Sequence, residues 1–405
     1  MEVVVTGIGL ISALGRLEPS WRSLLNGESG IRQHRPFPDL PSRPLALIGQ
    51  STTSLEKLTQ IVVADALQDA GLAMPMPDCG VVIGSSRSCQ ASWEQLAKSV
   101  GRQEWGVGTG KENSQSLFPL ISKGNYELRN SQCGITDLEH WLDTLPHHAA
   151  IAAARQIGST GPVLAPMAAC ATGIWAIAQG FELIQTGQCH RVIAGAVEAP
   201  ITPLTLAGFE KMGALARTGS YPFDRRREGL VLGEGAAVLV LESIHLARQR
   251  SASIYGKIRG FGLTCDAYHV SAPDPQYQGA IAAVKQCLQH SHLSPADINY
   301  IHAHGTGTQL NDQNEAQLIQ KFFAQGVPLS STKGATGHTL GASGALGTAF
   351  CLMALKHQIL PPSVGLMEPE FELDLVIAPR RCMIQHMLCF SFGFGGQNAV
   401  IALGK

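Results

Sequence analysis

The chain has few charged and few aromatic residues for its length, and its two charge signs nearly cancel. Charged residues make up 15% and aromatic residues 6% of the 405 residues, and 30 basic side chains face 31 acidic ones. A net charge of -1 gives no overall field that would hold nucleic acid or an anionic membrane. With 45% hydrophobic residues, the composition indicates a globular protein with a large core and excludes a disordered chain.

Long apolar runs and cysteine pairs are missing as well. No stretch reaches the ~18 to 20 apolar residues that a membrane span needs. The start at Glu2-Val3-Val4-Val5 has no charged segment before a long apolar run, so no signal peptide is predicted. The ten cysteines are scattered, with no C-x-x-C pair and no histidine cluster at zinc-finger spacing. We therefore expect reduced thiols, no metal site and a cytoplasmic location.

Short β-branched runs alternate with helical patterns, which predicts an α/β protein. The strand-like runs are Val3 to Val5, Val81 to Ile83, Val192 to Ala194, Ala237 to Leu241 and Tyr300 to His302. A helix is predicted from Ser54 to Ala70, with Gly71 as its stop. A second helix carries one apolar face, formed by Ile174, Ile177, Ala178, Phe181 and Ile184.

A sequence pattern that occurs twice in the chain suggests a duplicated fold. Val163-Leu164-Ala165 runs into Cys170-Ala171-Thr172-Gly173 and a helix, while Val327-Pro328-Leu329 runs into Ala335-Thr336-Gly337-His338 and another helix. A duplicated α/β fold with its site between the copies would explain this repetition, and coincidence in an Ala/Gly-rich chain is the alternative. The polar, poorly periodic segment from Arg87 to Leu145 is expected to be an insertion or cap.

Cys170 is a candidate nucleophile. It has small neighbours on both sides and a predicted helix behind it, and a helix N-terminus lowers a thiol pKa and favours the thiolate. A lone cysteine of this kind is nevertheless more often an inert core residue.

Two polar turns supply candidate partners. His304 follows a predicted strand in His302-Ala303-His304-Gly305-Thr306-Gly307-Thr308, at a strand end where α/β proteins place functional loops. Lys333 and His338 share the turn Ser331 to Gly341. Taken singly, such a histidine is as often a loop cap, and such a lysine is usually solvated.

The C-terminal run Phe392-Gly393-Phe394-Gly395-Gly396 is suited to a loop whose backbone N–H groups face a ligand, although a plain turn is the alternative. Near the start, Gly7-Ile8-Gly9 resembles part of a dinucleotide-binding loop. Position 12 is Ser rather than the third glycine, so a dinucleotide cofactor is rejected and no cofactor is expected.

Taken together in content, order and spacing, these segments resemble the β-ketoacyl synthases of the thiolase superfamily, most closely the elongating type II enzymes. The resemblance runs from Val3-Val4-Val5-Thr6-Gly7 to Gly393-Phe394-Gly395-Gly396 and covers most of the chain outside the Arg87 to Leu145 segment. It implies a thiolase-like α/β fold with two repeated α/β/α/β/α layered halves and mixed sheets. The expected halves are 1–250, which carries Cys170 and the cap at 87–145, and 251–405, which carries His304, Lys333, His338 and the glycine-rich loop.

The resemblance also implies the chemistry. Cys170 would take an acyl group from an acyl carrier protein, and His304 and His338 would hold malonyl-carrier protein while it decarboxylates. The backbone N–H groups of Cys170 and Phe394 would form the oxyanion hole, with Phe394 also a gate. The remaining implied roles are electrostatic tuning by Lys333, support of the Lys333 loop by Glu315, and substrate binding by Thr306, Thr308 and Gly395.

Partners and pathway follow from the same resemblance. Acyl carrier protein in its acyl and malonyl forms is the expected partner, and a homodimer is expected to pair through the strand Arg191 to Ala196. Carrier docking by Arg217, Arg225, Arg226 and Arg227 is a hypothesis, with a solvated surface as the alternative. Fatty acid elongation is the expected pathway, and the same chemistry in polyketide or specialised lipid synthesis is the main alternative.

Three related classes fit less well. A thiolase would need a second cysteine in the glycine-rich loop, where this chain has Phe394, and a chain-initiating synthase would pair Cys and His with Asn rather than with His338. A non-catalytic chain-length-factor-like partner would lack the nucleophile, whereas Cys170 is present.

Overall fold

The computed structural model describes residues 1–101 and 141–405, and its centre is one mixed sheet of 11 strands. The N-terminal half contributes β1 (Val3–Ser12), β2 (Gly15–Arg16), β5 (Gly80–Gly84), β6 (Val163–Leu164), β7 (Arg191–Glu198) and β8 (Gly235–Ser243). The C-terminal half contributes β9 (Gly256–Cys265), β10 (Tyr300–His302), β11 (Leu329–Ser330), β14 (His386–Gly393) and β15 (Gln397–Gly404). The order is β11-β10-β14-β15-β9-β1-β8-β7-β5-β6, with β2 paired to β1.

The two halves repeat the same strand order and direction. From one edge, β6, β5 and β7 are parallel, and β8 and β1 follow antiparallel. From the other edge, β11, β10 and β14 are parallel, and β15 and β9 follow antiparallel. The halves join where residues 3–5 pair with residues 256–258. The predicted duplicated α/β fold is therefore confirmed, while the division at residues 250 and 251 stays a prediction.

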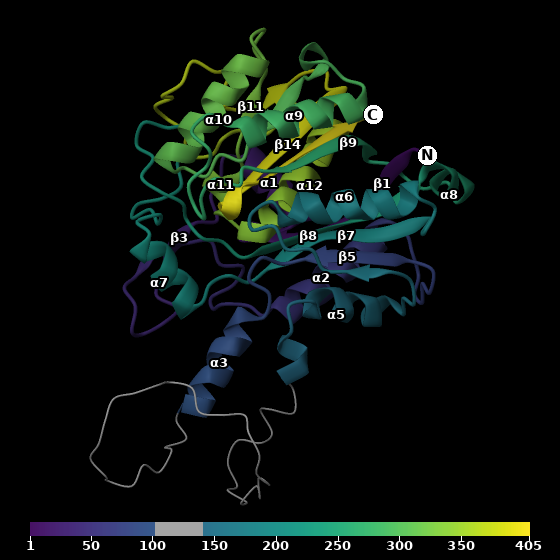
Figure 1. The fold of residues 1–405 in the computed structure, drawn as a ribbon, viewed down its shortest axis with the longest axis horizontal. Coiled ribbons are helices and arrows are strands. Elements are labelled where there is room, and N and C mark those ends of the chain that lie inside the picture. The colour runs from purple at the N-terminus through teal and green to yellow at the C-terminus, as the bar shows by residue number, and fades with distance from the viewer. Residues whose placement is uncertain (102–140) are drawn as a thin grey trace, which may run out of the picture.

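Helices form three layers around this sheet (Figure 1). The inner layer is α6 (Thr172–Gln185) and α12 (Ser343–His357), which pack against strands of both halves. The outer layers are α2 (Leu55–Asp69) with α5 (His148–Ile157) on the N-terminal half, and α9 (Gln278–Ser291) with α10 (Gln309–Phe322) on the C-terminal half. The shorter elements are α1 (Leu17–Leu25), α3 (Gln90–Gly101), α7 (Pro203–Lys211), α8 (Ile244–Gln249), α11 (Lys333–Thr336), β3 (Arg32–His34), β4 (Arg43–Leu45), β12 (Ile359–Leu360) and β13 (Arg380–Arg381).

Local sequence explains where the helices begin and end. Ser54 caps α2 by accepting a hydrogen bond from the backbone N–H of Lys57 at 3.2 Å, and Gly71 just beyond its end has φ +64°. Every residue of α12 from 343 to 355 is buried, as expected for a helix that is apolar on all sides and covered on all sides. The predicted helix from Ser54 to Ala70 and the five predicted strand runs are confirmed.

One prediction about the sheet edge is wrong. The strand Arg191 to Ala196, expected to pair with a second subunit, lies inside the sheet as part of β7, between β5 and β8. A strand that is apolar on both faces needs cover on both faces, and an internal position provides it. The edges of the sheet are β6 and β11 instead.

The segment expected to be a cap is only partly described. Its described ends are α3 and a single turn at Trp141–Thr144, so the segment begins as a helix rather than irregular chain. Residues 102–140 of the predicted cap lie outside the described residues. Within the described ranges, no helix is long and apolar enough to cross a membrane.

Candidate active site

Cys170 lies in a tight turn between β6 and the start of α6. The preceding residue, Ala169, has φ +46°, a conformation that residues with a side chain seldom adopt. The turn is fixed by the Ala168 N–H, which donates to Thr172 Oγ1 at 2.8 Å, and by Ser391 Oγ, which donates to the Cys170 carbonyl at 2.8 Å. Such local strain, held by surrounding bonds, is typical of a functional position.

Burial controls the protonation of this thiol. Desolvation raises the pKa of Cys170 from 9.0 to about 11, although the positive charge of Lys333 and the backbone N–H of Phe394 act to lower the pKa. A helix N-terminus contributes roughly 0.3 to 1 kcal/mol, which is less than one pKa unit. The expectation of a lowered pKa is therefore wrong for the protein without substrate, because the loss of water outweighs the helix dipole.

His304 and His338 meet Cys170 from the other half of the molecule. His304 follows β10, and His338 lies between α11 and α12. Their rings meet edge to face with centroids 5.3 Å apart, and one side-chain N or S atom from each of the three residues lies within 4.8 Å of the others. Burial, reinforced by the charge of Lys333, lowers the pKa of both histidines well below its usual value, so both imidazoles are neutral at pH 7.

Hydrogen bonds select the tautomers of these imidazoles. The Leu340 N–H donates to His338 Nδ1 at 3.2 Å, so the single proton of the neutral ring lies on Nε2. Lys333 Nζ lies 3.4 Å from His304 Nδ1 and also donates to the His304 carbonyl, which favours the same tautomer for His304. Both rings therefore have an Nε2–H available for donation to a substrate.

Glu315, on α10, holds the His304 loop. Its carboxylate accepts the backbone N–H of His304 at 2.6 Å and that of Gly305 at 2.7 Å. Burial raises the pKa of Glu315 to about 7, and burial lowers the pKa of Lys333 while the Glu315 charge opposes that shift. The structure thus differs from the expectation that Glu315 ties the Lys333 loop, because the side chain bonds the histidine loop and acts on Lys333 only through its charge.

The glycine-rich loop follows β14 and approaches the nucleophile. A Cβ on Gly393 would lie 2.9 Å from the Cys170 backbone nitrogen, so only glycine permits this approach. Phe394 and Gly393 line the same pocket as Cys170. Gly395, predicted to bind substrate, does not line this pocket, and its N–H donates to the Val270 carbonyl at 2.9 Å. With φ +75°, Gly395 turns the chain instead.

A pocket of about 120 Å³ contains this site. Thr306 and Thr308 line it, and their hydroxyls lie 2.9 Å apart. The Phe394 ring stacks on Phe209 with centroids 5.9 Å apart, so an aromatic pair forms part of the wall. Pockets for small molecules usually measure ~300 to 1,000 Å³, so an acyl chain needs this wall to move.

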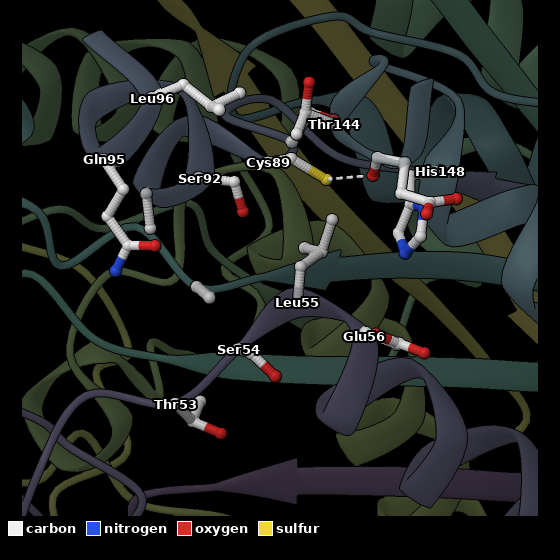
Figure 2. Close-up of a pocket in the computed structure, with 14 residues that line it drawn as sticks. Thr53, Ser54, Leu55, Glu56, Cys89, Ser92, Gln95, Leu96, Thr144 and His148 are labelled. Atoms are coloured by element: carbon white, nitrogen blue, oxygen red, sulfur yellow. Dashed lines mark hydrogen bonds between the residues drawn. The ribbon is translucent and has the colours of Figure 1, made fainter. Parts of the chain in front are cut away.

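A second pocket, of about 350 Å³, lies where α2, α3 and α5 begin. Figure 2 shows Leu55 below Cys89, whose sulfur donates to the Asp143 carbonyl at 3.6 Å, with His148 at the side. Ala199, one residue after β7, is also part of its wall. The second pocket therefore lies beyond the ends of the parallel strands β5 and β7.

The four arginines proposed for carrier docking have different environments. Arg217 and Arg225 are exposed. Arg226 is exposed but forms an ion pair with Asp224 at 2.9 Å. Arg227 is buried and paired with Glu370, so the prediction is wrong for this residue.

Sequence reasoning missed two buried carboxylates that shape the site. Asp312 accepts the backbone N–H of Phe223 at 2.8 Å and that of Gly307 at 3.2 Å. These two bonds hold the loop that carries Thr306 and Thr308 next to Phe223. Glu198, at the end of β7, is fully buried and accepts backbone N–H groups of the loop after β5. An acidic residue at the end of an apolar strand was the signal that could have identified Glu198.

Cys170, His304 and His338 have the composition and spacing of a metal site, and they are the one such group among residues 1–101 and 141–405. The Lys333 ammonium beside His304 would repel a bound cation. The arrangement is better suited to a cysteine nucleophile faced by two hydrogen-bond donors.

Comparisons with known proteins agree with this geometry. Residues 48–247 match the family described as "Beta-ketoacyl synthase, N-terminal domain", and residues 255–367 match "Beta-ketoacyl synthase, C-terminal domain". The chain is 34% identical to 3-oxoacyl-[acyl-carrier-protein] synthase 2 of Synechocystis sp. and 32% identical to that of Coxiella burnetii, covering 100% of this chain and 98% of each relative.

Solved structures give the same picture. A type II PKS ketosynthase in complex with its acyl-carrier protein and bound to the hexaketide has a TM-score of 0.86 at 27% identity, covering 100% of this chain and 99% of that one. A Beta-ketoacyl synthase from Burkholderia phymatum has a TM-score of 0.84 at 26% identity, with the same coverage.

Proposed function

The chain belongs to the β-ketoacyl synthase family, and from this premise we propose that it extends an acyl chain on Cys170 by decarboxylative condensation with malonyl-acyl carrier protein. The observation that carries the proposal is the meeting of Cys170, His304 and His338 within 4.8 Å, in a pocket between the two halves. The product would be a β-ketoacyl-acyl carrier protein.

In the first step the Cys170 sulfur attacks the acyl thioester. A new bond joins sulfur to the acyl carbon, the bond to the carrier thiol breaks, and the thiol proton ends on the departing carrier thiol. Lys333 and the Phe394 N–H both favour the negative sulfur, which offsets part of the cost of burial. The backbone N–H groups of Cys170 and Phe394 are proposed to hold the oxyanion of the tetrahedral intermediate.

In the second step malonyl-carrier protein loses carbon dioxide. The Nε2–H groups of His304 and His338 would donate to the malonyl thioester carbonyl, so the electron pair released by the departing carboxylate is stabilised as an enolate. The enolate carbon then attacks the acyl carbon, a carbon–carbon bond forms, and the Cys170 thiolate leaves and takes up a proton. Lys333 would orient the His304 ring through the contact with its Nδ1 atom. Thr306 and Thr308, which line the pocket, would bind the pantetheine arm of the carrier protein.

Fatty acyl chains are the first candidate substrates, because the curated relatives are 3-oxoacyl-acyl-carrier-protein synthases. Polyketide chains are the second, because a ketosynthase of similar fold binds a hexaketide. A ladder of acyl-carrier proteins, offered together with malonyl-carrier protein and followed by mass measurement of the products, tests both. We expect products two carbons longer; carbon dioxide release without any longer product would contradict the condensation.

A second copy of this chain is proposed to pair at β6. The other edge strand is covered, because Leu329 of β11 exchanges backbone hydrogen bonds with Asp374 and Val376. In the described part of the chain no strand lies outside β6, and Leu164 and Met167 beside it are 39% and 57% exposed. An open strand edge with exposed apolar neighbours favours pairing. Light scattering should give twice 43.0 kDa, and Leu164→Lys with Met167→Glu should give monomers.

The site of action is proposed to be the cytoplasm. All nine cysteines in the described ranges are free thiols, as in a reducing compartment. Fractionation of the source cells with an antibody against the chain would test this, and recovery from an oxidising compartment would contradict it.

A further inference from the structure

Arg87 is a partly buried cation without a hydrogen-bond or ion-pair partner among the described residues. It follows β5 in the loop whose next two residues, Ser88 and Cys89, line the pocket of Figure 2. Its Nε is buried and makes no hydrogen bond. No other guanidinium nitrogen of Arg87 forms a hydrogen bond or ion pair with any residue in 1–101 or 141–405.

The nearby carboxylate is fully engaged elsewhere. Glu198 Oε1 accepts Ser85 Oγ at 2.8 Å and the Arg87 backbone N–H at 2.9 Å. Glu198 Oε2 accepts Ser86 N–H at 2.8 Å, Ser86 Oγ at 2.6 Å and Gly341 N–H at 3.0 Å. Glu198 therefore fixes the backbone of the Arg87 loop and leaves the guanidinium unpaired.

The guanidinium contacts an aromatic ring of the active-site wall. Arg87 Cζ lies 5.6 Å from the centre of the Phe209 ring, and Phe209 stacks on Phe394. Phe209 and Phe394 line the pocket of Cys170, and the Arg87 charge is among those that act on the Cys170 thiol. An acyl group on Cys170 that displaces the Phe394 wall would come to lie beside this cation.

An apolar chain there would remove water from the guanidinium without supplying a hydrogen-bond acceptor. Burying a charged donor in this way has a large free-energy cost. A carboxylate or carbonyl oxygen would satisfy it, because arginine presents a planar array of donors to acceptor oxygens. We propose that Arg87 binds an acceptor oxygen carried by the acyl chain on Cys170, so that the protein selects oxygen-bearing acyl chains over hydrocarbon chains. This inference rests on the proposed condensation and names its substrate class.

Three thioesters of equal length and matched shape test the selection. Glutaryl, 5-oxohexanoyl and 5-methylhexanoyl groups differ only in ending with a carboxylate, a methyl ketone or an isopropyl group. Each is offered to the full chain as its N-acetylcysteamine thioester, and acylation of Cys170 is followed by intact-protein mass. We expect at least one oxygen-bearing group to react about 10-fold or more faster than 5-methylhexanoyl. A faster glutaryl group identifies a carboxylate as the partner, and a faster 5-oxohexanoyl group identifies a ketone.

Two variants and a control locate the effect. Arg87→Met keeps the length of the stem and should abolish the preference, whereas Arg87→Lys should retain part of it for glutaryl. Arg248→Met, which removes an exposed arginine on α8, should change nothing. Equal rates for the three thioesters in the parent, or an equal slowing of all three in Arg87→Met, would overturn the inference.

The proposed function is tested separately in the same samples by adding malonyl-carrier protein. Condensation of the 5-methylhexanoyl group, without a preference for the other two, would leave the function standing and the Arg87 inference refuted. Acylation of Cys170 without any condensation would refute the function.

Discussion

In each half of the molecule, a buried carboxylate accepts backbone hydrogen bonds from the loop that follows the middle one of the three parallel strands. These strands are β5 and β10, and the two loops carry different side chains. In the N-terminal half, Glu198 from the end of β7 holds the loop that carries Arg87. In the C-terminal half, Glu315 from α10 holds the loop that carries His304. His304 has Lys333 as its neighbour, whereas the Arg87 guanidinium has no hydrogen-bond or ion-pair partner among the described residues.

The difference indicates that the corresponding loops of the two halves have different roles in binding substrate. The C-terminal loop is completed within the protein, with its imidazole neutral and its tautomer fixed, as expected for a group that donates to one defined carbonyl. The N-terminal loop has the same backbone anchoring but ends in an unsatisfied donor, as expected for a group whose partner arrives with the substrate. The proposed nucleophile Cys170 lies within 4.8 Å of His304 and His338.

The largest effect should come from Cys170→Gln. Without the sulfur no acyl-enzyme can form, so condensation should fall by at least ~10⁴-fold. Decarboxylation of malonyl-carrier protein should continue, because it relies on the C-terminal half alone. Product mass and released carbon dioxide measure the two steps, and Cys265→Ser, an exposed cysteine, is the control. Condensation by the Cys170→Gln variant would remove the nucleophile assignment.

The next effect should come from His304→Ala and His338→Ala. Each removes one donor to the developing enolate, so decarboxylation should fall by about 10²- to 10³-fold, while acylation of Cys170 should change much less. Carbon dioxide release and the intact mass of the acylated protein separate the two steps. Parent rates of decarboxylation in either variant would contradict the role given to the histidines.

Smaller and contrasting effects are expected from the two carboxylates. Glu315→Gln and Glu198→Gln should each lower the free energy of unfolding by about 1 to 3 kcal/mol, because buried backbone N–H groups lose an acceptor. Glu315→Gln should also slow decarboxylation by about 10-fold through the displaced His304. Glu198→Gln should reduce the acyl preference of Arg87 and slow decarboxylation less than Glu315→Gln does, because Glu198 reaches the His338 turn only through the Gly341 N–H.

An exposed carboxylate controls for the charge lost in these variants. Glu228 accepts the backbone N–H of Arg217 and of Thr218 at the surface, so Glu228→Gln should change stability by less than about 1 kcal/mol. Denaturant unfolding measures stability. If Glu315→Gln and Glu198→Gln impaired the same catalytic step to the same extent, the different roles proposed for the two loops would be wrong.

The smallest effect is a dependence on pH. Burial lowers the pKa of His304 and His338, so their folded forms stay neutral below about pH 6.5, where unfolded histidines take up protons. The histidines should therefore cause no loss of decarboxylation as the pH falls from 8 to about 6, and any slowing in that range should come from protonation of Glu315, whose pKa is about 7. Stability should fall below about pH 6.5, by up to ~1.4 kcal/mol per pH unit for each such histidine.

Replacing one histidine measures how much that residue contributes to the pH dependence of the free energy of unfolding. His338→Asn should lose stability less steeply than the parent between about pH 6.5 and 5, because one proton-linked group is gone. Chemical denaturation at each pH gives the difference, in which the opposing contribution of Glu315 cancels. An equal slope in parent and variant would show that His338 titrates normally in the folded protein.

Much of this protein could be predicted from its sequence because the signals are local. The strand runs, the capped helix from Ser54 to Ala70 and the turns around Cys170, His304 and His338 all depend on neighbours within a few residues. The resemblance to one family then supplied the duplicated fold and the residues to compare.

Other features depend on residues far apart in the sequence, and only the tertiary structure decided them. The position of β7 inside the sheet depends on strands 51 and 112 residues away, such as the pairs Arg191 with Glu242 and Val82 with Ala194, so strand composition alone could not separate an internal strand from a paired edge. The contact of Glu315 with the His304 loop and the raised pKa of Cys170 likewise depend on how tightly the two halves exclude water.

The sequence by itself determined the fold class, the order of the elements and the candidate reactive side chains, because local propensity and motif spacing contain that information. Tertiary structure alone decided the protonation state of each group and the histidine tautomers. Within residues 1–101 and 141–405, it also decided that β6 has one unpaired edge and that the Arg87 guanidinium has no hydrogen-bond or ion-pair partner. These depend on burial and on hydrogen bonds between distant segments, and burial exists only once the two halves have closed around the site.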